Sequence, residues 1–227
     1  VPLKSDFTVE VGDYEGRKGT VFIANPNAPT GIALSADKIA ELAAQDEHRL
    51  VVVDEAYVDF GGETAAGLIK TAKNAVVVRT FSKSRSLAGG RLGYILAPEN
   101  IANDIERLRN SLNPYNVNSV TLAMGKASVA DDAYFRRNLE RVIAEREKTA
   151  DGLRKIGFKA LKSAANFLFV SPPDSDGKRL YDELRARNIL VRYFDTERLR
   201  AFCRISVGDK NATKRLLAAA REIYRAE

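Results

Sequence analysis

The chain has 227 residues, 45% of them hydrophobic and 29% charged, which excludes a disordered, collagen-like or membrane-spanning protein. A single cysteine, Cys203, and a single histidine, His48, exclude a disulfide framework and a multi-histidine metal centre, so we predict no metal. The net charge of +6 comes from basic residues mixed with acids, as at 145–148, a pattern typical of solvated helix faces. We therefore expect no nucleic-acid partner and no membrane partner.

The first half of the chain has the pattern of a parallel sheet with connecting helices. Apolar, β-branched runs predict strands at residues 21–24, 50–53, 75–80 and 93–97. A helix is predicted from Ser35, which can cap it, to about Gln45. Strands that are apolar on both faces indicate a largely parallel sheet covered by helices, and ligands of such sheets bind at the carboxyl ends of the strands.

The second half of the chain predicts a smaller α+β domain. A long amphipathic helix runs from Asp131 to about Ile156. It precedes predicted strands at 165–170, 189–192 and 202–207 and predicted helices at 178–188 and 210–224. We therefore predict an α/β protein with a large domain, residues 1–130, and a small C-terminal domain, residues 131–227, joined by the long helix. Cys203 is interpreted as a small buried hydrophobic residue.

A lysine among hydroxyl residues follows the third predicted strand. Lys83 is partly desolvated at such a place, which favours the neutral amine that attacks an aldehyde. Thr80 and Ser82 supply hydroxyl donors, and Arg91, in a glycine-rich stretch, supplies a planar double donor that suits phosphate. These residues predict a pocket for an aldehyde and a phosphate on one small molecule, a combination that pyridoxal 5′-phosphate has.

The second predicted strand ends in two further candidates. The carboxylate of Asp54 can pair with a pyridine nitrogen and keep it protonated, and Tyr57 can donate to the phenolic oxygen of the same ring. Each residue alone has an ordinary explanation, Asp54 as a turn residue and Ser82-Lys83 as an exposed loop pair. Their conjunction at the ends of successive strands favours the cofactor site.

Over essentially its whole length the chain resembles the pyridoxal-phosphate-dependent aminotransferases of fold type I, and among them the histidinol-phosphate aminotransferases. The broad marks are the loop 25–31, Asp54 with Tyr57, and Ser82-Lys83 with Arg91. The narrower marks are the segments 54–60 (DEAYVDF), 114–118 (PYNVN), 165–167, 191–192 and 204–208.

The resemblance implies a role for each cofactor-site residue. Lys83 forms the internal aldimine and then shuttles the proton between substrate and cofactor. Asp54 pairs with the pyridinium and Tyr57 with the phenolic oxygen. The phosphate is held by Thr80, Ser82 and Arg91.

The resemblance also implies a substrate site. Arg204 matches the arginine that holds the substrate's acidic group, and Arg192 matches a second arginine that helps to bind the phosphate of histidinol phosphate. Arg192 can also be read as a surface arginine at the end of a strand. Asn116 and Asn166 can line the substrate site, although asparagine at such positions is also ordinary turn chemistry.

Two departures from the family pattern stand out. Many members carry asparagine immediately before Pro-Thr-Gly, where this chain has Ala28, so either Asn27 takes the role or Tyr57 acts alone. The family's amino-terminal arm, a phosphate-binding loop and the aromatic residue that stacks on the ring have no counterpart. We therefore expect the sequence to be incomplete.

The resemblance implies transamination between L-histidinol phosphate and 2-oxoglutarate, giving imidazole-acetol phosphate and glutamate, in histidine biosynthesis. It also implies a homodimer with the site at the subunit interface, and a cytoplasmic location is expected from the lone cysteine. Alternatives of the same fold are an aromatic or other amino-acid aminotransferase and a phosphothreonine-type decarboxylase. A noncatalytic module that binds an effector or DNA is a third hypothesis.

Overall fold

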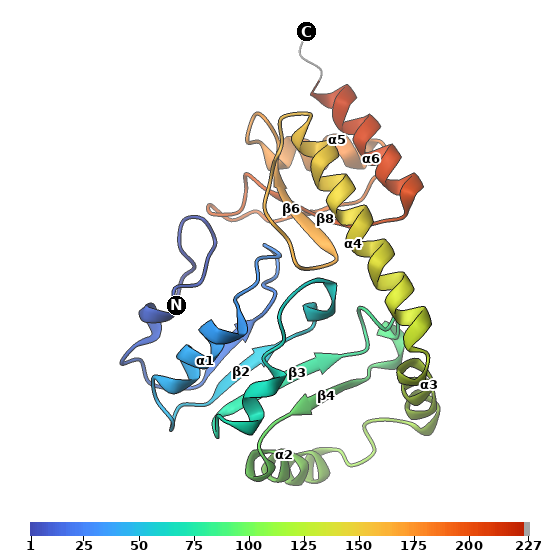
Figure 1. Cartoon of the computed structure of the whole chain (residues 1–227). Helices are drawn as coiled ribbons and strands as arrows, with labels where there is room; N and C mark the ends of the chain where they lie inside the picture. The colour runs from blue at the N-terminus through green and yellow to red at the C-terminus, as the bar shows by residue number, and fades with distance from the viewer. Residues whose placement is uncertain (225–227) are drawn as a thin grey trace. The chain divides into compact units, whose positions relative to one another are not determined.

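The computed structural model describes residues 1–224, which form two compact units. The first unit contains residues 1–27 and 33–137, and the second contains residues 28–32 and the chain from Asn138 onward (Figure 1). The division falls within the long helix α4 (Asp132–Arg154), which the sequence placed at 131–156. The domain limits 1–130 and 131–227 stay a prediction.

The first unit is built on a mixed, mostly parallel sheet in the order β1-β2-β3-β4. Its strands are β1 (Val21–Ala24), β2 (Val51–Asp54), β3 (Ala75–Thr80) and β4 (Gly93–Leu96). β1, β2 and β3 run parallel to one another, and β4 runs antiparallel to β3 (Figure 1). The bounds of each of the four strands lie within one residue of those of a predicted apolar run, because β-branched residues fit a pleated, buried surface.

Helix α1 (Ala36–Ala44) packs on one face of this sheet. The Ser35 side chain accepts a hydrogen bond from the backbone N–H of Lys38, so the predicted helix cap is confirmed. Ile39 and Leu42 are buried in one hydrophobic core with alternate residues of β1 and β2. On the opposite face Phe22 is 75% exposed, so no described residue covers this side chain of β1.

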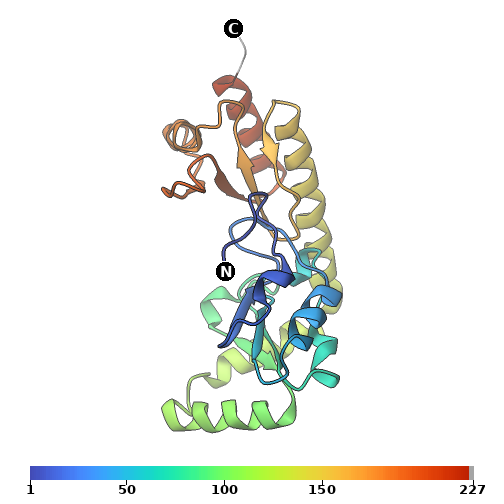
Figure 2. The same cartoon turned by 90° about the vertical axis from the view of Figure 1, so that its left-hand side faces the viewer.

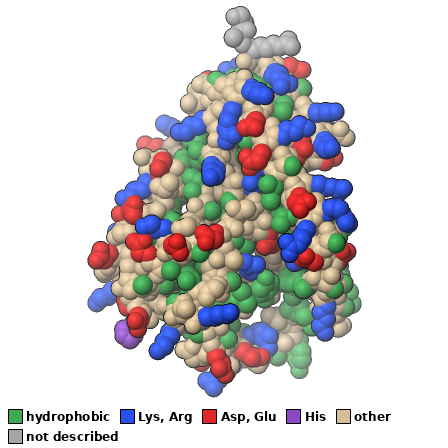
Figure 3. Space-filling model, in the orientation of Figure 1, with side chains coloured by type: hydrophobic (Ala, Val, Ile, Leu, Met, Phe, Trp, Pro, Cys, Tyr) green, Lys and Arg blue, Asp and Glu red, His purple; other side chains and the backbone are tan. Residues whose placement is uncertain are grey.

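Two helices of the first unit were not predicted, α2 (Glu99–Leu112) and α3 (Ser119–Ala130). No residue of α2 is buried, and Figure 2 shows this helix projecting from the sheet. α3 approaches the loop before β4 closely, because a Cβ at Gly125 would lie 2.5 Å from Leu92 Cδ2. Tyr94 of β4 and Leu122 of α3 are exposed hydrophobic side chains. Figure 3 shows hydrophobic side chains gathered at the lower right of the view, where Figure 1 places α3 and β4.

Short 3-10 helices occupy loops of the first unit. They are η1 (Val11–Tyr14), η2 (Val58–Phe60), η3 (Ala66–Lys70) and η4 (Ala88–Gly90). η2 follows the end of β2, and η4 lies in the loop between β3 and β4. Both therefore shape the edge of the sheet at which the predicted site residues lie.

The second unit holds an antiparallel sheet in the order β5-β6-β8-β7. Its strands are β5 (Lys159–Ala160), β6 (Phe167–Ser171), β7 (Arg192–Tyr193) and β8 (Cys203–Ser206), and its other helices are α5 (Gly177–Ala186) and α6 (Lys210–Ile223). The predicted strand 189–192 is wrong except at Arg192. Asn188 has a left-handed φ of 55° after α5, and Leu190 is 83% exposed, so the segment turns before it can pair.

The core of the second unit lies between its sheet, α4, α5 and α6. Leu153 of α4, Leu168 of β6 and Cys203 of β8 belong to one buried cluster. The mixed charges at 145–148 do not form one solvated face as predicted, because Glu145 and Arg146 are buried. Arg146 Nη1 donates to the carbonyl of Ala165 at 3.0 Å, and this hydrogen bond offsets part of the cost of burying the guanidinium.

Among the described residues, no helix combines the length and the apolar character that crossing a bilayer requires.

Burial of Cys203 predicts an unreactive thiol. Its Sγ donates to the carbonyl of Gly177 at 3.1 Å, and burial raises the pKa of the thiol to about 12. At pH 8 the native protein therefore holds roughly a thousandfold less thiolate than the unfolded chain, whose cysteine has a pKa of about 8.5. We expect a disulfide reagent to label Cys203 only after denaturation in guanidinium. Ser111→Cys, which adds an exposed thiol on α2, is the control and should react at once in the native state. Rapid stoichiometric labelling of the unmodified native protein would contradict the burial.

Candidate functional site

The carboxyl ends of β1, β2 and β3 meet at one edge of the first unit's sheet. Backbone hydrogen bonds continue beyond the strands, from Asn25 N–H to the Asp54 carbonyl at 2.8 Å and from Glu55 N–H to the Val78 carbonyl at 2.9 Å. The Asp54 side chain is exposed at this edge and accepts from Ala56 N–H at 2.9 Å. No Lys or Arg side chain among the described residues pairs with it. Asp54 is thus a fixed carboxylate that is open to a ligand.

Lys83 and Tyr57 lie together near this edge. The Nζ of Lys83 is 5.1 Å from the centroid of the Tyr57 ring, although the two residues come from the segments after different strands. Lys83 is exposed, and no carboxylate of the described residues lies within salt-bridge distance of it. The partial desolvation predicted for Lys83 is wrong for this chain, because the residue follows the strand in an exposed loop; its role and that of Tyr57 stay predictions.

A closed loop carries the predicted phosphate-binding residues. Phe81 N–H donates to the Leu92 carbonyl at 3.0 Å and closes the loop at its base. Ser82 and Arg91 are the next residues inward from this bond along the chain. Ser82 N–H donates to Thr80 Oγ1 at 3.0 Å. Arg91 has a left-handed φ of 52°, and its exposed guanidinium donates to the Ala88 carbonyl through Nη1.

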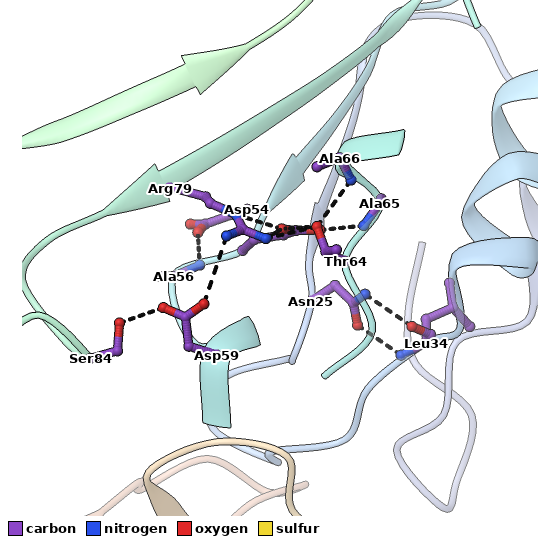
Figure 4. Close-up of polar contacts among 11 residues, drawn as sticks. Asn25, Leu34, Asp54, Ala56, Asp59, Thr64, Ala65, Ala66, Arg79 and Ser84 are labelled. Carbon is purple, nitrogen blue, oxygen red and sulfur yellow. Dashed lines mark hydrogen bonds and ion pairs between the residues drawn. The ribbon is translucent and has the colours of Figure 1, made fainter. Parts of the chain in front are cut away.

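The loop after β1 is anchored by Asn25. Its buried side chain donates to the Leu34 carbonyl at 3.0 Å and accepts from Leu34 N–H at 2.7 Å (Figure 4). Asn27 is half-buried, while Ala28 is exposed and belongs to the second unit. The role of Asn27 therefore stays a prediction, and Asn25 has a structural task in this loop.

The sequence did not predict a network of charged residues that lies beneath this edge. The side chain of Glu55 is fully buried and accepts a hydrogen bond from Arg79 Nε at 2.9 Å, and its Oε2 forms an ion pair with Arg79 Nη2 at 2.8 Å. Thr64 Oγ1 and Ala65 N–H also donate to this carboxylate. Arg79 Nη1 lies 3.7 Å from Asp59 Oδ1, and Asp59 joins Arg79 to Ser84 in Figure 4. A charged residue inside a run predicted to be a buried strand was the available signal, since buried charges need partners.

The charge of Arg79 is secured by its neighbours. Burial by itself lowers the pKa of this guanidinium, but the hydrogen bond and the charge of Glu55 raise the pKa more, with a further contribution from Tyr94. Tyr94 lies directly opposite Arg79 across the β3–β4 pair. Arg79 therefore remains a cation between two carboxylates.

A cavity of about 820 Å³ lies beside this network in the first unit. Its charged lining residues are Glu55, Asp59, Arg79, Arg85 and Lys126, and apolar residues such as Leu92 and Leu122 form much of the rest. Lys83, Asp54 and Tyr57 do not line it. The cavity is therefore separate from the predicted reacting groups.

The second unit brings the two predicted substrate arginines together. Arg192 of β7 is the direct cross-strand partner of Arg204 of β8, so both side chains lie on one face of the sheet. Arg204 lies 5.0 Å from the ring of Phe167, and Arg192 lies 5.5 Å from the ring of Phe194. Within the described residues neither guanidinium pairs with a carboxylate. Two opposed like charges are unfavourable until an anion neutralises them.

The two predicted asparagines lie in different units. Asn116 is exposed in the segment between α2 and α3, in the first unit. Asn166 is half-buried just before β6, and its carbonyl accepts from Val207 N–H at 2.9 Å. Their roles in substrate binding stay predictions.

The first unit's residues fit pyridoxal phosphate by their chemistry. An accessible amine suits its aldehyde, the carboxylate of Asp54 suits its pyridinium, and the hydroxyls and guanidinium of the loop 80–91 suit its phosphate. The fit rests on the nearness of these groups to one sheet edge, a place where ligands of α/β sheets bind.

Comparisons with known proteins agree with this chemistry. The sequence profile of the family aminotransferase class I and II matches residues 2–219. The chain is 39% identical over 208 residues to histidinol-phosphate aminotransferase of Clostridium botulinum (strain 657 / Type Ba4), covering 92% of this chain and 59% of that protein. It is 42% identical over 227 residues to histidinol-phosphate aminotransferase 1 of Bordetella parapertussis, covering 99% of this chain and 64% of that protein.

A similar solved structure is histidinol-phosphate aminotransferase from Sinorhizobium meliloti in complex with pyridoxal-5′-phosphate. The TM-score is 0.81 at 27% identity, and the match covers 91% of this chain and 57% of that one. The fold predicted from the sequence is therefore confirmed. The chain spans about three fifths of the length of these relatives.

Replacement of Arg79 tests the buried ion pair. Arg79→Met leaves the Glu55 charge buried without its cation, so the free energy of unfolding should fall by about 3 kcal/mol or more in urea titrations. The matched control is Arg107→Met, which removes an arginine paired with Asp104 where both side chains are exposed. The control should lose less than about 1 kcal/mol. Equal losses of unfolding free energy in the two variants would show that the buried Glu55–Arg79 pair stabilises the fold no more than an exposed ion pair.

Proposed function

Because the chain belongs to the aminotransferase class I and II family, we propose that the complete protein is a pyridoxal-phosphate-dependent aminotransferase. Its substrates are L-histidinol phosphate and 2-oxoglutarate, and its products are imidazole-acetol phosphate and glutamate. The activity belongs to histidine biosynthesis. The names of the relatives at about 40% identity support this choice of substrate.

The observation that carries the proposal is the placement of Lys83. Its amine is exposed, lies over the Tyr57 ring, and follows the strand next to the one that ends in Asp54. An amine, a phenol and an unpaired carboxylate at one sheet edge match the three polar positions around a pyridoxal ring. A surface lysine without a ligand does not require a neighbouring phenol and carboxylate.

Each residue has a task that its environment supports. The cofactor, when bound, supplies an electron sink for the bond that breaks at the substrate carbon. Lys83 Nζ attaches the cofactor and later takes and returns the proton of the carbon that carries the amino group. The Asp54 carboxylate keeps the pyridine nitrogen protonated, and the Tyr57 hydroxyl donates to the phenolic oxygen. Asn27 is a further candidate donor to that oxygen.

The phosphate of the cofactor is assigned to the loop 80–91. Ser82 and Arg91 flank the base of this loop and offer a hydroxyl and a guanidinium. Thr80 Oγ1 already accepts from Ser82 N–H and lies 3.4 Å from the Leu92 carbonyl, so its share is smaller. Bidentate guanidinium pairing makes Arg91 the strongest single anion donor of the set.

Opposed arginines support an anionic substrate. Arg192 and Arg204 are direct cross-strand partners, and within residues 1–224 no carboxylate pairs with either, so an anion relieves their repulsion. Histidinol phosphate brings a phosphate in one half-reaction, and glutamate brings carboxylates in the other. We assign the phosphate to Arg192 and the substrate acid to Arg204, with Asn116 and Asn166 as further lining residues. A homodimer and a cytoplasmic location are part of the proposal.

The cofactor spectrum tests the role of Lys83. The complete protein with pyridoxal phosphate should show a visible absorbance band that histidinol phosphate converts to the pyridoxamine form. Lys83→Ala should lose the shift and reduce turnover by at least about a thousandfold, because a covalent catalyst has no substitute nearby. Lys70→Ala, which removes another first-unit lysine, is the control. Normal turnover in Lys83→Ala would contradict the assignment.

Substrate discrimination tests Arg192. In Arg192→Ala, kcat/KM for histidinol phosphate should fall by about tenfold to a hundredfold through the loss of a charged hydrogen bond, while kcat/KM for phenylalanine changes little. Arg185→Ala, in the exposed face of α5, serves as the control. Equal losses for both substrates would remove the phosphate role. A protein that prefers phenylalanine from the outset would favour the aromatic aminotransferase alternative, and release of carbon dioxide would favour the decarboxylase.

A further inference from the structure

Each residue of the charged network, Glu55, Asp59, Arg79 and Ser84, lies within two positions in the sequence of a residue of the proposed site. Glu55 follows Asp54, Arg79 precedes Thr80, and Ser84 follows Lys83. Asp59 lies two residues after Tyr57, in η2. A connection among these four neighbours therefore fixes four site residues through the backbone.

The connection is continuous. Glu55 holds Arg79 through the hydrogen bond from Nε and an ion pair with Nη2, and Arg79 Nη1 lies 3.7 Å from Asp59 Oδ1. The other oxygen of that carboxylate, Oδ2, accepts from Ser84 Oγ at 2.5 Å. Figure 4 shows Asp59 between Arg79 and Ser84. The chain of contacts thus runs from the end of β2 to the loop that carries Lys83.

The network is anchored at one end and open at the other. The side chain of Glu55 is 0% exposed, that of Arg79 is 20% exposed and that of Asp59 is 30% exposed. Burial makes the Glu55 end rigid, because an unpaired carboxylate there is costly. The Asp59 carboxylate therefore contacts the Arg79 guanidinium through one oxygen and accepts from the Ser84 hydroxyl through the other.

We propose that Asp59 and Ser84 are positioning residues that hold the Lys83 loop in its working geometry, with Glu55 and Arg79 as the anchor. This inference rests on the proposed function, since it concerns the lysine that attaches the cofactor. Neither residue touches the reacting atoms in this arrangement. Their effect reaches the chemistry through the orientation of Lys83 Nζ, and misplacement of a reacting group by about 1 Å can cost up to a hundredfold in rate.

The variants separate the parts of the contact. Ser84→Ala removes the hydroxyl, and Ser84→Thr restores one at the same place. Asp59→Asn keeps the shape of the side chain but removes the charge that Arg79 holds. Ser86→Ala is the control, because it removes an exposed hydroxyl from the same loop.

The first readout is independent of the cofactor. In the complete, cofactor-free protein we expect Ser84→Ala and Asp59→Asn to raise amide hydrogen exchange in the peptide 81–86, by about tenfold or more. Exchange in α1 should stay unchanged, and Ser84→Thr and Ser86→Ala should behave as the wild type. Wild-type exchange in both Ser84→Ala and Asp59→Asn would overturn the proposal.

The second readout concerns the loaded enzyme. Ser84→Ala and Asp59→Asn should shift the pH at which the cofactor's visible band titrates, and should lower kcat by about tenfold with little change in KM. Ser84→Thr should recover most of kcat. If these two variants exchange faster in the peptide 81–86 but keep the wild-type kcat and the wild-type titration of the cofactor band, the network has only a structural role. That result would overturn the proposal.

Different results would contradict the proposed function and the positioning role of Asp59 and Ser84. If wild-type protein attaches no cofactor at Lys83, the proposed function falls, whatever the loop does. If wild type attaches it and the variants match wild type in both readouts, the positioning role falls alone.

Discussion

The buried ion pair between Glu55 and Arg79 is the constraint on which the rest of the first unit's site depends. A carboxylate without solvent is tolerated at the end of β2 because a guanidinium from β3 and donors from the next loop satisfy it. The pair fixes the carboxyl ends of two parallel strands against each other. The side chain of Asp54 can then stay exposed, because its sequence neighbour Glu55 carries the packing.

Local patterns were enough for most of the fold. Val21–Ala24 and Ala75–Thr80 were predicted with the observed bounds, because continuous β-branched residues have few alternatives to a buried strand. α2 was not predicted although Ile101, Ile105, Leu108 and Leu112 follow helical spacing, and in the structure none of its residues is buried. The strand predicted at 189–192 is wrong except at Arg192: its β-branched residues suit a strand, but the left-handed Asn188 turns the chain first.

The site shows the same division between local and long-range information. Lys83, Asp54 and Tyr57 could be predicted from residues near strand ends, and the structure places Lys83 beside Tyr57. The contact between Asp59 and Ser84 joins residues 25 positions apart, and no local pattern announces it. The pairing of Arg192 with Arg204 likewise depends on the register between β7 and β8. Sequence supplies the chemical groups, whereas strand pairing decides which of them meet.

The claim at the centre of this account is that Lys83 attaches pyridoxal phosphate. The most direct measurement is borohydride reduction of the cofactor-loaded complete protein, followed by proteolysis and mass spectrometry of the lysine-containing peptides. The account predicts one pyridoxyl group per chain, on the peptide that contains Lys83. A pyridoxyl group on another lysine, or none on a folded and complete protein, would contradict it.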